Sequence, residues 1–186
     1  MQKLYNKNRK FLGLGSNIEN RLSNLRECIR RLLQIPGLIL KQWSPIYETR
    51  PIDNSPQENF LNMVVEIDYL STPLQLLKEI KSIETGMGRK TLYRWGPRNI
   101  DIDILFFGSE IMKTSLLSIP HPEIVNRKFV LKPMVDIASD FKCPVSGLCI
   151  TELYRSCTDE NKVWDYMESR RDFPLFDPSP IIDLSL

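Results

Sequence analysis

Two aspartates separated by one residue are the clearest candidates for chemistry in this sequence. Asp101 and Asp103 flank Ile102 inside an apolar run that ends at Phe107. Side chains two positions apart on a β-strand point to the same face, so both carboxylates would lie side by side. Such carboxylates repel each other unless a cation lies between them, and Mg²⁺ typically takes one or two carboxylates together with substrate phosphates. The pair therefore predicts a magnesium and phosphate site, with a solvated strand face as the alternative.

A cluster of basic residues comes directly before this pair. Arg94, Trp95 and Arg98 fall within the run Arg-Trp-Gly-Pro-Arg, which ends three residues before Asp101. Arginines beside such a site can neutralise charge that develops on transferring phosphoryl oxygens. A tryptophan on a loop offers a flat apolar surface for a ring. The alternative is a charged loop with its tryptophan folded into the core.

Two further motifs concern nucleotide binding. His121 lies between two prolines and could contact phosphate, although a purely structural histidine is the alternative. The segment Gly13-Leu14-Gly15-Ser16-Asn17 superficially suggests a dinucleotide loop, but Ile18 stands where the third glycine of G-x-G-x-x-G would fall. The sequence also contains no G-x-x-x-x-G-K-[ST] loop. A nucleotide would therefore have to be bound by another architecture.

The elements that must position these residues alternate as β-α-β-β-α-β. Strands are expected at 10–14, 38–47, 60–69 and 100–107, from their β-branched and aromatic residues. Helices are expected between the Asn17 cap and Pro36, and from Pro73 to Gly86, from their apolar residues at three- and four-residue steps. This order predicts a ferredoxin-like α/β (α+β) sheet. Two helices would cover one face and leave the other to a ligand.

The C-terminal part adds elements to this unit. A helix is expected from 122 or 123 to 138, followed by a weaker strand and helix between Cys143 and Cys157. We expect one domain over residues 1–169 and an extended tail over 170–186, where three prolines and scattered aspartates follow one another.

The bulk composition excludes several classes of protein. Hydrophobic residues make up 42% and charged residues 26% of 186 residues, which is typical neither of a disordered chain nor of a membrane protein. A net charge of +2 gives no sign of a nucleic-acid binder. The four cysteines form no C-x-x-C pair and there is one histidine, so a zinc site is not expected. No signal-peptide pattern is present, which predicts free thiols and a cytoplasmic location.

Taken together, the motifs closely resemble those of the 6-hydroxymethyl-7,8-dihydropterin pyrophosphokinase family. Their order and spacing match over roughly Phe11 to Ala138, and the run R-W-G-P-R-x-x-D-x-D is highly specific. The segments that carry the resemblance are Gly15-Ser16-Asn17, Phe60-Leu61-Asn62, Ile83-Glu84, Gly88-Arg89, Arg94 to Arg98, Asp101-x-Asp103, Pro120-His121-Pro122 and Asn126-Arg127-x-Phe129.

The resemblance implies a ferredoxin-like fold and one reaction. The β,γ-pyrophosphate of ATP, the co-substrate, would move to the hydroxymethyl group of a reduced pterin in folate biosynthesis and leave AMP. Two Mg²⁺ ions would take part, which makes the protein a Mg-dependent diphosphotransferase. The expected partners are these small molecules, with no nucleic acid and no membrane, and the protein is expected to be a monomer.

Residue roles follow from the same resemblance. Asp101 and Asp103 would bind both metal ions. The residues expected to act on the transferring group are Arg89 and Arg98. ATP would be surrounded by Glu84, Arg89, Arg98, His121 and Arg127. The pterin would contact Thr49, Ile52, Asn62, Trp95 and Phe129, with the Phe129 ring stacked on it and Trp95 on a loop that closes over the site.

Some positions depart from the family pattern, and one other class of function competes. Thr91, Asp53 and Leu116 stand where the family often has Arg, Gly and Arg, which we interpret as tuning because the aspartates and flanking arginines remain. The alternative is a ferredoxin-like nucleic-acid binding module without catalysis, in which strand aromatics stack on bases. The strand Phe60 to Tyr69 lacks the expected RNA-binding run, and a carboxylate pair on the open face would repel RNA.

Overall fold

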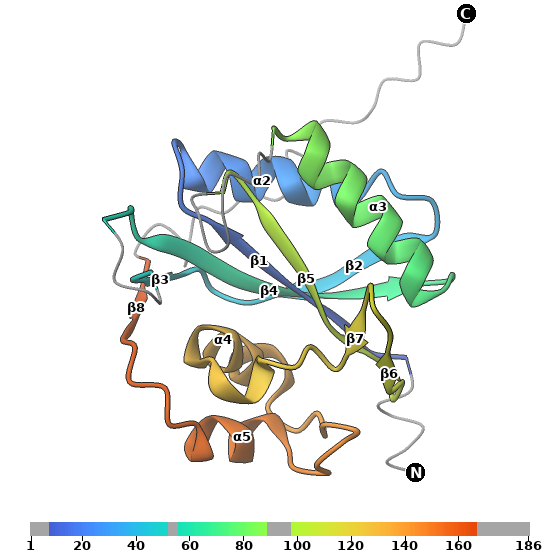
Figure 1. Cartoon of the computed structure of the whole chain (residues 1–186), viewed down its shortest axis with the longest axis vertical. Coiled ribbons are helices and arrows are strands. Elements are labelled where there is room, and N and C mark those ends of the chain that lie inside the picture. The colour runs from blue at the N-terminus through green and yellow to red at the C-terminus, as the bar shows by residue number, and fades with distance from the viewer. Residues whose placement is uncertain (1–7, 52–55, 89–97, 167–186) are drawn as a thin grey trace, which may run out of the picture.

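The computed structural model describes residues 8–51, 56–88 and 98–166 of the chain. The first part of the chain forms β1 (Lys10–Ser16), α2 (Arg21–Leu32), β2 (Leu38–Trp43), β3 (Tyr47–Thr49), β4 (Phe60–Tyr69), α3 (Pro73–Gly86) and β5 (Asp101–Phe107). The second part forms the β6 (Met112–Lys113) and β7 (Ser118–Ile119) hairpin, the 3₁₀ turn η1 (Ile124–Asn126), α4 (Lys128–Ala138), α5 (Ile150–Ser156) and β8 (Val163–Asp165) (Figure 1).

The main sheet confirms the ferredoxin-like prediction. Its strands run in the order β5-β1-β4-β3-β8, with β2 also paired to β4, and all pairs are antiparallel. The strand predicted at 38–47 ends at Trp43 as β2, and a separate short strand, β3, begins at Tyr47 and runs to Thr49. They separate at Ser44 and Pro45, because Pro45 has no N–H to donate and the Ser44 hydroxyl accepts a hydrogen bond from the Val64 N–H at 3.0 Å.

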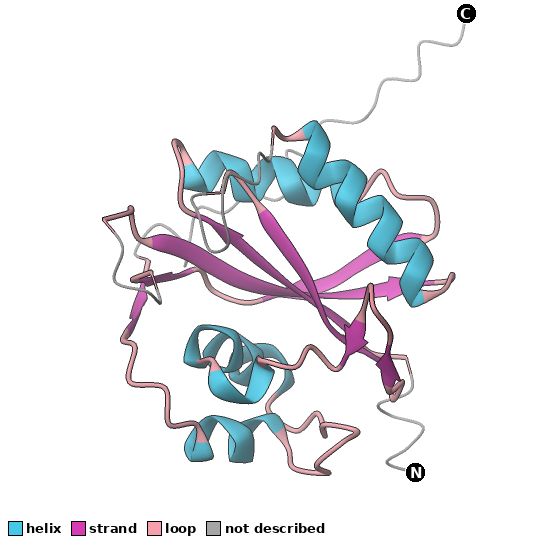
Figure 2. Cartoon of the chain, in the orientation of Figure 1, coloured by secondary structure: helices cyan, strands magenta, loops and turns pink. Residues whose placement is uncertain are grey.

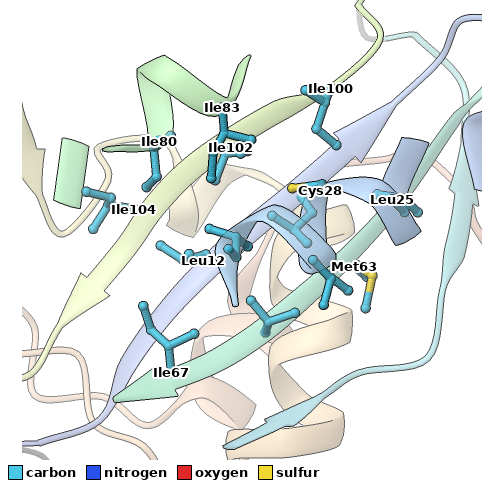
Figure 3. Close-up of a cluster of buried hydrophobic side chains, with 14 of the residues drawn as sticks. Leu12, Leu25, Cys28, Met63, Ile67, Ile80, Ile83, Ile100, Ile102 and Ile104 are labelled. Carbon is cyan, nitrogen blue, oxygen red and sulfur yellow. The ribbon is translucent and has the colours of Figure 1, made fainter. Parts of the chain in front are cut away.

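Helices α2 and α3 cover one face of the sheet, as predicted (Figures 1 and 2). Their apolar sides bury residues such as Leu25 and Ile80 against Leu12 and Ile102 of the strands (Figure 3). The helix α2 starts later than expected. Its cap is Asn20, whose side chain accepts from the Ser23 N–H, and not Asn17.

The opposite face is covered in large part, which the sequence did not predict. Helix α4 packs below the sheet in Figure 1, and α5 lies beneath α4. The rings of Phe11, Phe106 and Phe141 meet edge to face there, with centroids 4.9–6.3 Å apart. In the described part of the chain, a cavity towards the N-terminal end of α4 leaves strand residues accessible to a ligand.

The C-terminal additions differ from the prediction in detail. The helix expected from residue 122 or 123 is split into η1 and α4, and the strand expected after Cys143 is a single bridge between Lys142 and Cys149. The outermost strand β8 was not predicted at all. In the described parts of the chain no helix combines the length and apolar character that crossing a membrane requires. The expected tail, residues 170–186, lies outside the described residues.

Candidate active site

A cavity opens at the uncovered end of the sheet, between the strands and the start of α4. Seven of the predicted site residues line it, although they come from four separate stretches of the chain. These residues are Thr49, Asn62, Arg98, Asp101, Asp103, Arg127 and Phe129. These residues come together because β5, β1, β4 and β3 are neighbours in the sheet, and the relevant end of each strand lies on the same side of it.

The floor of the cavity is made by two glycines of β1. Gly15 lies opposite Asp101 in the strand register, and Gly13 lies opposite Asp103. A Cβ atom on Gly15 would lie 3.2 Å from Oδ1 of Asn62, and one on Gly13 would lie 3.3 Å from a methyl group of Leu105. The two glycines thus allow Leu105 and Asn62 to pack closely against β1. Sequence reasoning considered both glycines as part of a failed dinucleotide loop, and Gly15 also as part of the family pattern.

The two aspartates point into the same cavity, as their alternation on β5 predicted. The Arg98 guanidinium donates a hydrogen bond to the Asp101 carboxylate and forms an ion pair with it. No described residue forms an ion pair with Asp103. Burial raises the pKa of Asp103, and the negative charge of Asp101 raises it further, while His121 and Arg127 oppose these effects. Both burial and the neighbouring carboxylate therefore disfavour the ionised form of Asp103.

The cavity can also hold a flat polar molecule. The Asn62 side-chain amide donates a hydrogen bond of 2.8 Å to the Thr49 hydroxyl, and both side chains are buried. Phe129, at the start of α4, lines the same cavity, and the Arg127 guanidinium lies 5.7 Å from its ring centroid. An amide that can donate and accept, next to an aromatic face, suits a heterocyclic ring.

Glu84 lies outside the cavity lining and supports the strand of the aspartates. Its carboxylate is buried, accepts the Ile102 N–H at 2.9 Å and accepts from Lys81 Nζ at 2.7 Å. β5 is an edge strand of the sheet, so this N–H has no strand partner and the carboxylate takes that place. Glu84 therefore holds the backbone between Asp101 and Asp103.

His121 is held by hydrogen bonds to the backbone of two other residues, and it does not line the cavity. Its N–H donates to the Leu105 carbonyl at 3.0 Å, and its Nδ1 accepts from the Glu123 N–H at 3.2 Å. The imidazole is nevertheless close enough to Asp103 to oppose the rise of that carboxyl's pKa. A ligand phosphate held at Asp103 would thus lie near His121.

Three predicted site residues, Ile52, Arg89 and Trp95, lie outside the described residues.

Asn17 holds the backbone of Arg98. Its Oδ1 accepts from the Arg98 N–H at 2.8 Å, and its own N–H donates to the Arg98 carbonyl at 3.1 Å. Sequence reasoning placed Asn17 at a helix cap and missed this role, because no local pattern indicates a contact 81 positions along the chain.

Arg50 is a second residue that sequence reasoning missed. It lines the cavity directly after Thr49, and its guanidinium lies 5.7 Å from the centroid of the Trp164 ring in β8. The contact of Arg50 with Trp164 could not be expected, because the strand β8 was not predicted.

Comparison with known proteins agrees with this geometry. The model of the family described as 7,8-dihydro-6-hydroxymethylpterin-pyrophosphokinase matches residues 11–139. A Haemophilus influenzae protein named 2-amino-4-hydroxy-6-hydroxymethyldihydropteridine pyrophosphokinase is 36% identical over 153 residues, which cover 82% of this chain and 95% of that protein. The Bacillus subtilis protein of the same name is 42% identical over 127 residues, or 68% of this chain and 76% of its own length.

Solved structures of larger proteins share the fold. A crystal structure of an HPPK-DHPS in complex with substrates aligns with a TM-score of 0.62 and 20% identity, over 81% of this chain and 43% of that one. The wild-type Plasmodium falciparum HPPK-DHPS aligns with a TM-score of 0.61 and 20% identity, over 80% of this chain and 40% of that one. This chain thus spans less than half of each. The family model and the curated relatives show that the chain belongs to the 7,8-dihydro-6-hydroxymethylpterin-pyrophosphokinase family.

Proposed function

We propose that the cavity between Asp101, Asp103 and Phe129 is where this chain transfers pyrophosphate from ATP to 6-hydroxymethyl-7,8-dihydropterin in folate biosynthesis. One observation carries the proposal. Two carboxylates and an arginine line a single cavity together with an amide and an aromatic ring. That lining combines oxygen donors for a metal-bound triphosphate with an amide and an aromatic face for a ring.

The carboxylate end fits Mg²⁺. Asp101 and Asp103 supply oxygen donors side by side. Burial and then the charge of Asp101 raise the pKa of Asp103, and a bound cation would favour its ionised form. Gly13 and Gly15 line the cavity opposite these aspartates. We propose that these two aspartates hold two Mg²⁺ ions, which when bound would neutralise the phosphates and orient them for attack. The described residues contain no cluster of three or more His, Cys, Asp or Glu side chains, so ATP phosphates would supply further ligands.

The side chains of the chain itself bind and orient the two substrates. In the proposed step, the pterin hydroxymethyl oxygen forms a bond to the β-phosphorus as the bond from that phosphorus to the oxygen of the α-phosphate breaks. AMP leaves, and the hydroxyl proton passes to solvent or to a phosphate oxygen. Arg98 and Arg127, which line the cavity, would stabilise negative charge on the moving group. Positioning and electrostatics supply most of the catalysis in such transfers.

The remaining roles rest on the family pattern. Arg89 would contact the moving group, Glu84 and His121 would lie around ATP, and Ile52 and Trp95 would contact the pterin. For Glu84 the described contacts favour an indirect role, because its carboxylate is taken up by Ile102 and Lys81. We further propose that the protein acts as a cytoplasmic monomer.

The test is to identify the products. The protein is incubated with ATP, Mg²⁺ and the reduced pterin, and the nucleotide product is separated by chromatography. We expect AMP in an amount equal to the pterin diphosphate. Asp101→Asn and Asp103→Asn should each lower kcat by at least about a hundredfold, as loss of a group that stabilises transition-state charge does. Formation of ADP, or normal rates in both variants, would contradict the proposal.

A further inference from the structure

The chain after α5 forms a strap that joins two parts of the fold that contribute residues to the cavity, the start of α4 and strand β3; these are called the two walls of the cavity. The strap comprises residues Cys157 to Tyr166 and runs from below α4 to the outer edge of the sheet, where it ends in β8 (Figure 1). It lies beyond residues 11–139, which the family model matches. Its contacts therefore add something that the family motifs do not describe.

One end of the strap holds the start of α4. Oδ2 of Asp159 accepts a hydrogen bond of 2.9 Å from the Lys128 N–H, and Oδ1 accepts one of 3.0 Å from the Asn161 N–H. Arg127, at the cap position of α4, makes no capping bond with its own side chain. Asp159 therefore supplies the cap from a distant part of the chain, and its negative charge suits a helix N-terminus. The two neighbours of Lys128, Arg127 and Phe129, line the cavity.

The other end of the strap holds β3. Val163, Trp164 and Asp165 pair with Thr49, Glu48 and Tyr47. The Tyr166 N–H donates to the Ile46 carbonyl at 3.0 Å, so the pairing continues past the strand. Without β8, β3 would be an edge strand paired with β4 alone. The strap thus fixes the position of Thr49, which accepts the hydrogen bond of Asn62.

A second contact between α4 and β3 lies deeper in the helix. The Tyr47 hydroxyl donates to Asp136 at 2.5 Å and accepts from Lys132 Nζ at 2.7 Å. These bonds hold the middle of α4, one to two turns beyond Phe129. The first turn of α4 lies closer to the cavity than these Tyr47 bonds. We therefore infer that the bond from Asp159 to the Lys128 N–H holds the first turn in position.

We propose that Asp159 is a positioning residue for the pterin end of the site, and that it acts by capping α4 so that Phe129 stays at a fixed distance from the Thr49–Asn62 pair. This inference rests on the proposed function. Asp159 touches neither substrate. Its effect reaches the pterin through the backbone of Lys128, and the strap keeps the two walls at the separation that one ring requires.

The test compares three variants of the full chain. Asp159→Ala removes the cap, Asp159→Asn keeps an acceptor oxygen, and Glu160→Ala is the control, since Glu160 is the exposed neighbour with the same charge. For Asp159→Ala we expect the KM for the pterin to rise about three- to tenfold, as loss of a helix cap predicts. The KM for ATP should stay within about twofold. Asp159→Asn should recover most of the loss, and Glu160→Ala should match the wild type.

A second readout does not depend on activity. Hydrogen exchange of the amides of Val130 and Leu131, in the first turn of α4, should speed up in Asp159→Ala, while exchange in β4 stays unchanged. An unchanged pterin KM, or equal rises in KM for both substrates, would overturn the inference. Equal exchange rates in Asp159→Ala and the wild type would overturn it as well. If the wild type forms no AMP, the proposed function fails instead, and the exchange experiment alone decides whether Asp159 caps α4.

Discussion

The half-buried carboxyl of Asp103 lowers the stability of the metal-free protein. Burial and the Asp101 charge raise its pKa, so both effects favour the protonated form. A carboxyl with a raised pKa contributes stability at low pH and loses that contribution as the pH rises through its folded-state pKa. At neutral pH the ionised group therefore destabilises the metal-free protein, which is the usual consequence of placing charge where a ligand will neutralise it.

Replacing this carboxyl should stabilise the protein while it abolishes turnover. In EDTA at pH 7 to 8, Asp103→Asn should unfold a few degrees above the wild type, since one kcal/mol corresponds to about 2–4 °C for a protein of this size. The difference should shrink in acid, where Asp103 becomes protonated. Thermal unfolding followed by circular dichroism measures this. A lower Tm for Asp103→Asn at neutral pH would mean that the carboxylate is part of a stabilising network.

The Phe129 ring should matter to one substrate only. Phe129→Ala should raise the dissociation constant for the pterin about tenfold or more, because stacking of a base on an aromatic ring is worth about 1–3 kcal/mol. ATP binding should change by less than about twofold. Phe129→Tyr, which keeps a flat face, is the matched control. Titration of each ligand separately gives both constants, and equal losses for the two ligands would show that Phe129 is only part of the core.

At the residue scale, short-range patterns predicted well and long-range contacts did not. The alternation of a strand was enough to place Asp101 and Asp103 together. In contrast, the bond from Asn17 to Arg98 and the stacking of Arg50 on Trp164 join segments 81 and 114 positions apart. The types of these residues indicate no partner, so only the folded sheet shows the contacts.

At the scale of elements, the edge of β5 depends on a helix. Glu84 of α3 accepts the Ile102 N–H, which has no strand partner. Glu84→Ala should lower the free energy of unfolding by about 1–3 kcal/mol, the usual cost of a buried unsatisfied donor. Glu84→Gln, which keeps an acceptor oxygen, should lose less. Urea unfolding measures both, and an Ala variant as stable as the wild type would show that the edge needs no such support.

The sequence predicted the elements that carry their own periodicity and missed those created by packing. α3 begins at Pro73 and ends at Gly86 as expected, because proline and glycine mark its two ends. β8 has only three residues, which is too short for a periodic pattern to show. It is a strand because it pairs with the free edge of β3. The cover formed by α4 was missed for the same reason, since an apolar helix does not indicate which face of a sheet it meets.

At the scale of the whole molecule, the two layers of helices explain why the site lies at one end. α2 and α3 cover one face, and α4, with α5 beneath it, covers part of the other (Figure 1). Among the described residues, the cavity at the end of the sheet near Asp101 and Phe129 is left for a ligand. This arrangement also argues against the nucleic-acid module. The face that would stack bases in such a module is occupied by α4, and a carboxylate pair stands at its open end.

The most direct test of the account is to locate the metal ions. A crystal of the protein with Mn²⁺ in place of Mg²⁺, a non-hydrolysable ATP analogue and the pterin would show the ions by anomalous scattering. We predict two ions bound by the carboxylates of Asp101 and Asp103 and lying next to the triphosphate. Ions bound elsewhere, with Asp101 still paired to Arg98 and Asp103 without a ligand, would contradict the account.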